Sequence, residues 1–170
     1  MVPSEDGNAY TDEEVTNIIA NLSGKVQNTT GPTSHLWQTT LRFFTMMLHS
    51  GCRTSEMWHV EFQDCLYKTY DTLKVETLNL KILVPKTGYR ETIIESNIPL
   101  LQKETLATKG IKVGKTTSLW CNPNTKKAYS LSSIRQKFRE VLKEEGLEEN
   151  HRLYDARATY ITERLLNSGG

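Results

Sequence analysis

An arginine and a glutamate lie three residues apart at Arg53 and Glu56, directly after an apolar helical stretch that ends at Gly51. In a helix, residues at this spacing share one face, so the carboxylate can hold the guanidinium in place. A guanidinium held in this way can bind two oxygens of a phosphate group. The ordinary alternative is a salt bridge on a helix surface, and these two residues alone do not decide between the alternatives.

Three further residues could join a phosphate site. Lys86 lies in a turn expected between two strands, and Tyr154 and Arg157 share a face of the last expected helix because they are three residues apart. Two arginines, a lysine and a phenol can neutralise and protonate a phosphodiester whose oxygens gain charge in the transition state. Taken singly, Lys86 as a plain turn residue and Tyr154 as a helix-packing residue remain the alternatives.

The spacing of apolar residues predicts the elements that must position these side chains. Alternation over residues 72–84 and 90–98 predicts a β-hairpin with Lys86 at or near its tip. The pattern as a whole predicts an α+β fold: one mainly helical domain over residues 11–170 with a small antiparallel sheet or hairpin, preceded by a flexible lead-in over residues 1–10. We expect helices from Thr11 to Gly24, Ser34 to Ser50, Arg53 to His59, Pro99 to Thr108, Ser130 to Gly146 and Arg152 to Asn167.

Composition narrows the class of protein. A chain of 170 residues can bury the core of one domain, and no run approaches the roughly 18 apolar residues of a membrane span. Residues 1–10 lack the apolar stretch of a secretory signal. Three cysteines without metal-ligand spacing predict neither a disulfide framework nor a metal site, and indicate a reducing, cytosolic setting. Residues 1–84 carry a net charge of −4 and residues 85–170 carry +5, a mild asymmetry that favours an anionic partner.

One segment partly matches the motif of a nucleotide-binding loop. Gly114, Lys115 and Thr116 match the end of a P-loop, but Lys109 stands where the motif needs its first glycine. A helix rather than a strand is also expected before the segment. The sequence therefore predicts no nucleotide cofactor.

Three motifs, in this order, resemble the catalytic domain of tyrosine recombinases, the phage-integrase type of site-specific recombinase. The first box of that family typically reads Gly-Leu-Arg-Ile-Ser-Glu, and residues 51–56 read Gly-Cys-Arg-Thr-Ser-Glu. The family often has Lys-Thr-Gly on a hairpin before a strand ending in Pro-Leu, as in residues 86–88 and 99–100. Its second box often begins His-Asp-Leu-Arg-His-Thr, where residues 154–159 read Tyr-Asp-Ala-Arg-Ala-Thr. The resemblance covers about residues 11–170.

The resemblance implies a role for each candidate residue. Arg53 and Arg157 would clamp the scissile phosphate, Glu56 would orient Arg53, Lys86 would protonate the leaving 5′ oxygen, and Tyr154 would take the place of the usual histidine. The partner would be duplex DNA, on which copies of the full-length protein assemble. The reaction would cleave and rejoin DNA through a 3′-phosphotyrosyl intermediate, without metal, cofactor or small-molecule substrate, in a cytoplasmic, DNA-associated protein of a mobile element.

The sequence departs from the family pattern in two ways. Tyr154 replaces a histidine, and a phenol with a pKa near 10 is a poorer base than imidazole at neutral pH. The third box and the attacking tyrosine normally follow the position of Gly169 by some tens of residues, so we expect this polypeptide to be part of a longer enzyme and not to cleave DNA alone. Three alternatives remain open: a non-catalytic DNA-binding relic or regulator of recombination, a type IB topoisomerase-like domain, and an unrelated interaction domain.

Overall fold

The computed structural model describes residues 7–70, 75–84 and 88–167. The chain divides into two compact units, a division that the sequence pattern did not indicate. Unit 1 combines Met1–Thr54 with Ser130–Gly170, and unit 2 is the continuous segment Ser55–Tyr129.

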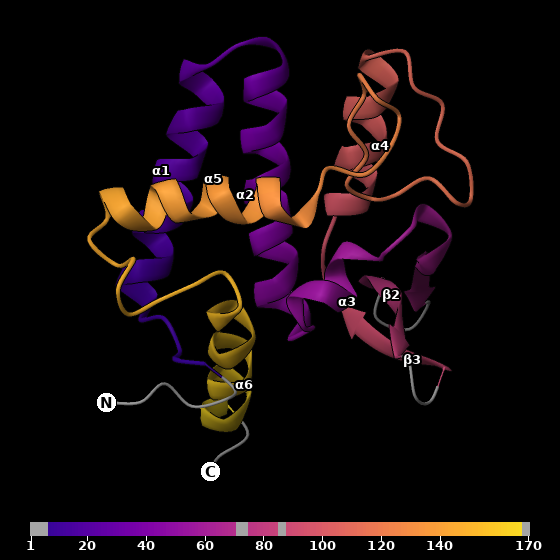
Figure 1. The fold of residues 1–170 in the computed structure, drawn as a ribbon. Helices are drawn as coiled ribbons and strands as arrows, with labels where there is room; N and C mark the ends of the chain where they lie inside the picture. Colours follow the sequence, from indigo (N-terminus) through magenta and orange to yellow (C-terminus); the bar gives the residue numbers. More distant parts are fainter. Residues whose placement is uncertain (1–6, 71–74, 85–87, 168–170) are drawn as a thin grey trace. The chain divides into compact units, whose positions relative to one another are not determined.

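Unit 1 is helical. Its helices are α1 (Asp12–Asn28), α2 (Gly31–Ser50), α5 (Leu131–Glu144) and α6 (Asp155–Asn167). In Figure 1, α1 and α2 run side by side and α5 crosses them. The apolar stripes of these helices meet in a shared core, where the rings of Phe44 and Phe138 are 4.8 Å apart. Other fully buried members of this core are Ile18, Leu22, Phe43, Met46, Met47, Ile134 and Val141.

Three helix boundaries differ from the prediction by three residues or more. Helix α6 begins at Asp155 rather than at Arg152, so Tyr154 lies just before the helix and not on it. The predicted start of α1 is confirmed, with a capping box formed by Thr11 and Glu14, but the helix continues through Gly24 to Asn28. One glycine costs a helix only about 1 kcal/mol, and α1 packs along α2. Helix α2 begins at Gly31 rather than after Ser34, because Pro32 falls in the first turn, where its missing N–H is not needed.

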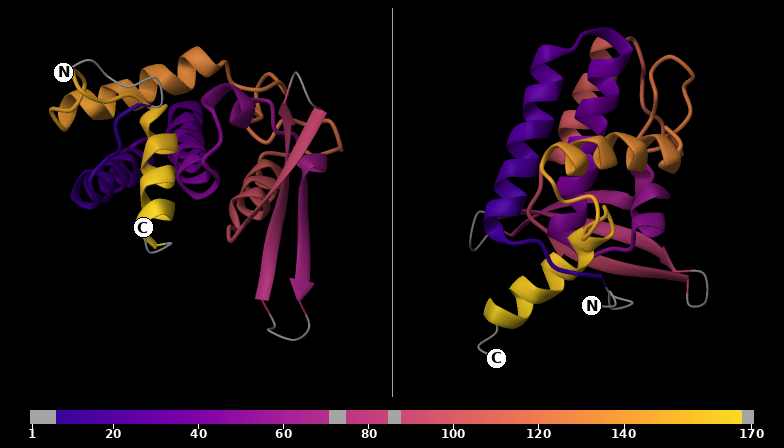
Figure 2. Two further views of the ribbon diagram at one scale, coloured as in Figure 1. Left: turned by 90° about the horizontal axis from the view of Figure 1, so that it is seen from below. Right: turned by 60° about the vertical axis from the view of Figure 1, so that its left-hand side comes forward.

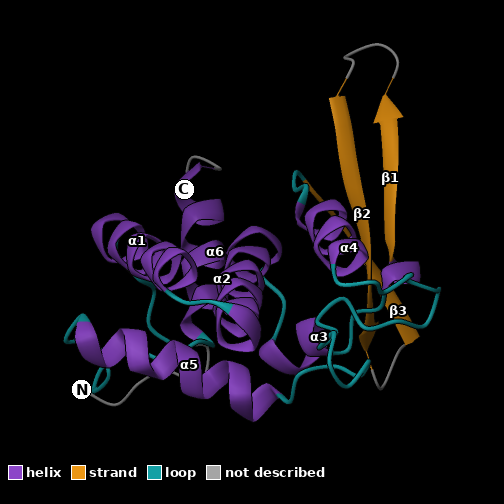
Figure 3. Cartoon of the chain, turned by 90° about the horizontal axis from the view of Figure 1, so that it is seen from above, coloured by secondary structure: helices purple, strands orange, loops and turns teal. Residues whose placement is uncertain are grey.

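Unit 2 is built on a three-stranded antiparallel sheet in the order β1-β2-β3. Figure 3 shows this sheet with α4 alongside it. The strands are β1 (Cys65–Tyr70), β2 (Val75–Val84) and β3 (Gly88–Ile94), the helices are α3 (Thr54–Trp58) and α4 (Ile98–Thr108), and a 3-10 turn, η1, covers Phe62–Asp64. The predicted α+β class and small antiparallel sheet are thus confirmed. Strand β1 was not predicted, because it is short and its half-exposed edge position gives weak alternation of apolar residues.

A long connection without regular structure, between α4 and α5, is anchored by side chains of unit 2 (Figure 2). Trp120 is fully buried, and its indole N–H donates to the carbonyl of Met57 at 2.9 Å. The amide of Gln102 on α4 donates to the carbonyl of Leu119 at 2.8 Å. These bonds satisfy backbone carbonyls that strand or helix partners would otherwise satisfy.

None of the helices in the described part of the chain is long and apolar enough to cross a membrane.

Candidate functional site

The first and second boxes meet inside unit 1. Gly51 caps α2 in the left-handed conformation, with φ of 66°, and its carbonyl accepts a hydrogen bond of 3.1 Å from Nη1 of Arg157 on α6. The Nε of Arg157 is buried and has no hydrogen-bond partner among the described residues. A buried guanidinium N–H without a partner is costly, so Arg157 is a side chain with unused donor capacity.

Arg53 lies two residues after Gly51 and is exposed. Between them Cys52 is fully buried, so the turn is fixed on the core while the next side chain projects outward. Unit 1 therefore brings the backbone of the first box to Arg157 and leaves Arg53 accessible. The clamp of two arginines on one phosphate stays a prediction.

Asp155 fixes the start of α6, the helix that carries Arg157. Its carboxylate is 2% exposed and accepts hydrogen bonds from the backbone N–H groups of Asn8 and Arg152, both at 3.1 Å. Nδ1 of His151 lies 3.0 Å from the second carboxylate oxygen. A carboxylate at a helix N-terminus also interacts favourably with the helix dipole. Asp155 therefore ties the second box to a segment almost 150 residues earlier.

Residues 7–10 form part of this anchor, although we expected them to belong to a flexible lead-in. Tyr10 is 5% exposed, its N–H donates to Oγ1 of Thr159 at 2.8 Å, and its phenol donates to the carbonyl of Arg152 at 2.6 Å. Its ring stacks on His151 with centroids 4.3 Å apart. Burial raises the pKa of the Tyr10 phenol, and nearby Asp155 and Glu14 raise it further, so the phenol stays a donor at neutral pH.

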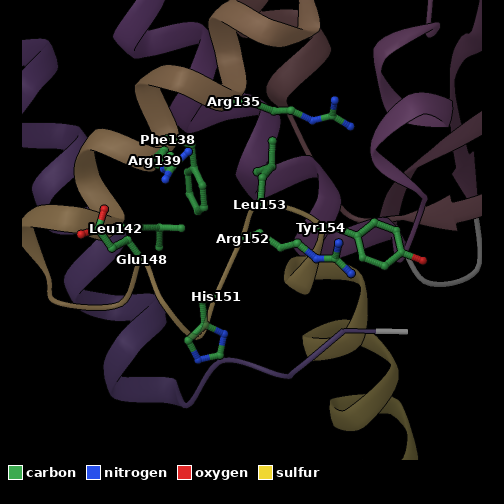
Figure 4. Close-up of a pocket in the computed structure, with 9 residues that line it drawn as sticks. All are labelled: Arg135, Phe138, Arg139, Leu142, Glu148, His151, Arg152, Leu153 and Tyr154. Atoms are coloured by element: carbon green, nitrogen blue, oxygen red, sulfur yellow. The ribbon is translucent and has the colours of Figure 1, made fainter. Parts of the chain in front are cut away.

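A cavity of about 430 Å³ opens between α5 and the segment that leads into α6 (Figure 4). Buried Phe138, Leu142 and Leu153 supply its apolar lining. Tyr154, half-buried immediately before α6, lines the same cavity. The other polar side chains of the lining are Arg135, Arg139, Glu148, His151 and Arg152. Tyr154 therefore lies beside a cavity that carries more positive than negative charge.

Glu56 pairs with a residue that the sequence did not single out. Its carboxylate accepts a hydrogen bond of 3.1 Å from Nη2 of Arg90 on β3, and the Glu56 side chain is 11% exposed. This ion pair joins α3 to β3 within unit 2. Orientation of Arg53 by Glu56 stays a prediction, and Lys86 lies outside the described residues.

We expect the Glu56–Arg90 pair to contribute about 0.5 to 1 kcal/mol to the stability of unit 2, because Glu56 is largely shielded from water. A double-mutant cycle of Glu56→Gln and Arg90→Gln, measured by urea unfolding, gives this coupling energy directly. Lys68 and Glu91 on the same sheet, 3.9 Å apart and both about half exposed, form the control pair, whose coupling should be close to zero. Equal coupling in the two cycles would contradict the role assigned to Glu56.

Three arginines of the candidate site, Arg90, Arg135 and Arg139, were not singled out from the sequence. For Arg90 no local signal existed, because its partner is 34 residues away. For Arg135 and Arg139, the signal was their spacing of one helical turn, which places two like charges together on α5. Within the described ranges, no group of histidine, cysteine, aspartate and glutamate side chains could hold a metal ion.

Neither a protein-family model nor a curated protein sequence matches the chain. Solved structures do. The XerH site-specific recombinase bound to palindromic difH substrate, a post-cleavage complex, is similar with a TM-score of 0.70 and 15% identity, over 95% of this chain and 43% of that one. The chain has the tyrosine recombinase catalytic-domain fold. The pre-cleavage complex of XerH with difH also gives a TM-score of 0.70 and 15% identity, over 96% of this chain and 44% of that chain.

The XerA recombinase is similar with a TM-score of 0.62 and 16% identity, over the whole of this chain and 54% of that one. The chain therefore spans about half the length of the recombinases whose structures it matches, or less. At 15% to 16% identity the likeness establishes the fold and leaves the chemistry to the site residues.

Proposed function

We propose that this chain binds duplex DNA as part of a site-specific tyrosine recombinase that cleaves and rejoins DNA strands. The observation that carries the proposal is the hydrogen bond from Arg157 to the carbonyl of Gly51. It joins the two arginine-bearing motifs within unit 1, the motifs that in this family would hold the scissile phosphate. The recombinase fold supports the same reading.

In the proposed complex, Arg157 uses its free N–H donors to hold a non-bridging oxygen of the phosphate. Arg53 approaches the same phosphate from the turn after α2. Both guanidinium groups stabilise the charge that gathers on the phosphate oxygens during strand transfer. A guanidinium is not deprotonated in proteins, so both groups can act in this way throughout the reaction.

Three further residues, Tyr154, Lys86 and Glu56, act beside the two arginines. Tyr154 donates a hydrogen bond to the phosphate, because a phenol O–H is a hydrogen-bond donor. Lys86 protonates the departing 5′ oxygen, and Glu56 supports the first box. Copies of the parent protein assemble on the DNA, and one strand end is held covalently until it is rejoined.

We expect an Arg53→Ala/Arg157→Ala variant to bind a random-sequence duplex of about 30 base pairs at least about tenfold more weakly than the parent chain at low salt. Loss of one phosphate contact should also make the fall of log affinity with log salt concentration less steep. The magnitude of the slope should decrease by about 1. Fluorescence anisotropy across a salt series measures both. Binding is the readout, because it depends on the phosphate contacts and needs no attacking tyrosine.

A Lys103→Ala/Lys109→Ala variant removes the same charge from exposed positions of unit 2 and is the matched control. Arg53→Gln with Arg157→Lys keeps more of the side chains, in case the alanine variant unfolds. Weakening that is no greater than that of the lysine control would contradict the phosphate clamp.

A further inference from the structure

We infer that the cavity beside Tyr154 is a second phosphate site, which holds a sugar–phosphate unit of the DNA strand other than the scissile one. The inference rests on the proposed function, since it concerns a further contact with the same strand. All the residues that line the cavity belong to unit 1.

Two of the cations that line the cavity have no partner among the described residues. Arg135 and Arg139 are exposed on α5, and neither has a hydrogen bond or ion pair with another described residue. They lie one helical turn apart, where like charges destabilise a helix by a few tenths of a kcal/mol. Glu148 is the acidic residue of the lining, against three arginines. The arrangement therefore lowers the stability of the free protein slightly and favours an anion.

The third arginine is already positioned. The guanidinium of Arg152 lies 5.0 Å from the centre of the Tyr154 ring, and its Nε is 3.8 Å from the Asp155 carboxylate. Figure 4 shows Arg152 and Tyr154 together on one side of the cavity. An arginine stacked on an aromatic ring and held at Nε still presents its terminal N–H donors, and its side chain is 61% exposed.

The apolar part of the lining indicates a ligand that is larger than a bare anion and partly apolar. Phe138, Leu142 and Leu153 are almost fully buried and contribute carbon surface, which a hydrated ion does not need. A volume of about 430 Å³ lies in the range of ligand pockets and exceeds a phosphate group. A deoxyribose ring against this surface, with its phosphate among the arginines, uses both parts of the cavity.

The place of the site follows from Tyr154, which lines the cavity and immediately precedes the helix of Arg157. A strand whose scissile phosphate reaches Arg157 would pass the cavity within a few nucleotides. The second contact would fix the register of the strand in the site, since backbone contacts position DNA without reading its sequence.

The test is salt-dependent binding of the 170-residue chain to a duplex, comparing Arg135→Gln/Arg139→Gln with the parent chain. Loss of one phosphate contact should weaken binding at least about tenfold and lower the salt slope by about 1. Lys137→Gln/Lys143→Gln removes the same charge from the same helix, outside the cavity, and should change both quantities less. Arg135 and Arg139 are exposed, so the melting temperature of the arginine variant should stay close to that of the parent chain. Lys137 is half-buried over the ring of Trp37, so the melting temperature of the lysine variant shows how much of its effect comes from lost packing.

A second measurement separates the possible phosphate sources. Side-chain NMR signals of Arg135, Arg139 and Arg152 are followed while inorganic phosphate, deoxynucleoside monophosphate or a short duplex is added. Shifts that saturate with the duplex at far lower concentration than with the two small anions support the inference. Shifts with the small anions and none with the duplex would overturn it in favour of a free-anion site.

Further outcomes distinguish the two proposals. Equal weakening by the arginine and lysine pairs, or none by either, overturns the second site while DNA binding through Arg53 and Arg157 stands. If the parent chain binds no duplex, the proposed function fails. In that case, if neither inorganic phosphate nor the deoxynucleoside monophosphate shifts the arginine NMR signals, the cavity is not a phosphate site either.

Discussion

Gly51→Ala is expected to destabilise the protein by about 3 kcal/mol. The φ of 66° costs a residue with a side chain roughly 1 to 2 kcal/mol. An added Cβ would also collide with the ring of Tyr160 on α6, and relieving such overpacking costs about 1 to 3 kcal/mol. Urea unfolding followed by circular dichroism measures the loss.

Two companion variants make this result specific. Gly24→Ala lies inside α1 with open space around the new Cβ, and it should stabilise the protein by up to about 1 kcal/mol. In a Tyr160→Ala background the collision is gone, so Gly51→Ala should cost only the backbone part. The same cost in both backgrounds would show that the contact between Gly51 and Tyr160 is not tight.

Asp155→Ala is expected to cost about 3 kcal/mol as well, for a different reason. Removal of the buried carboxylate leaves the N–H groups of Asn8 and Arg152 without their acceptor, and Nδ1 of His151 without its partner, while Nε2 of His151 stays near Glu14. Each unsatisfied buried donor costs about 1 to 3 kcal/mol, reduced wherever water can reach it. Urea unfolding gives the total, and amide hydrogen exchange at Asn8 should accelerate sharply.

The controls separate the acceptor role from the charge. Asp155→Asn keeps one acceptor oxygen and should lose about half as much stability. Asp12→Ala removes an exposed carboxylate from the first turn of α1 and should cost only a few tenths of a kcal/mol. Unchanged exchange at Asn8 in Asp155→Ala would mean that residues 7–10 are held by Tyr10 alone.

The elements with a strong local signal were predictable. The capping residues of α1 and α5 and the spacing of apolar residues in α2 are properties of a few neighbouring positions, and the structure confirms all three helices. The ends of the helices were harder to predict. Packing outweighs the small free-energy cost of Gly24 inside α1, and Pro32 is tolerated in the first turn of α2. Strand β1 carried too little alternation to be recognised.

The candidate site likewise has parts with a local sequence signal and parts that depend on tertiary packing. The motifs around Arg53 and Arg157 are short runs of consecutive residues, so they could be identified by their resemblance to a known family. The contacts that position them join residues far apart in the chain, such as Asp155 with Asn8 and Gly51 with Arg157. No spacing rule reaches across 100 residues, so these contacts follow from the tertiary structure alone. The cavity beside Tyr154 likewise depends on how the segment before α6 packs against α5.

Unit 1 is assembled from the two ends of the chain, with unit 2 as a continuous insertion between them. During synthesis, α1 and α2 therefore emerge before α5, whose Phe138 packs against Phe44 in the finished core. Unit 2 is complete when Tyr129 has left the ribosome, before the second half of unit 1 exists. Since exposed apolar helices bind chaperones or aggregate, the yield of native protein should depend on how fast residues 130–167 follow.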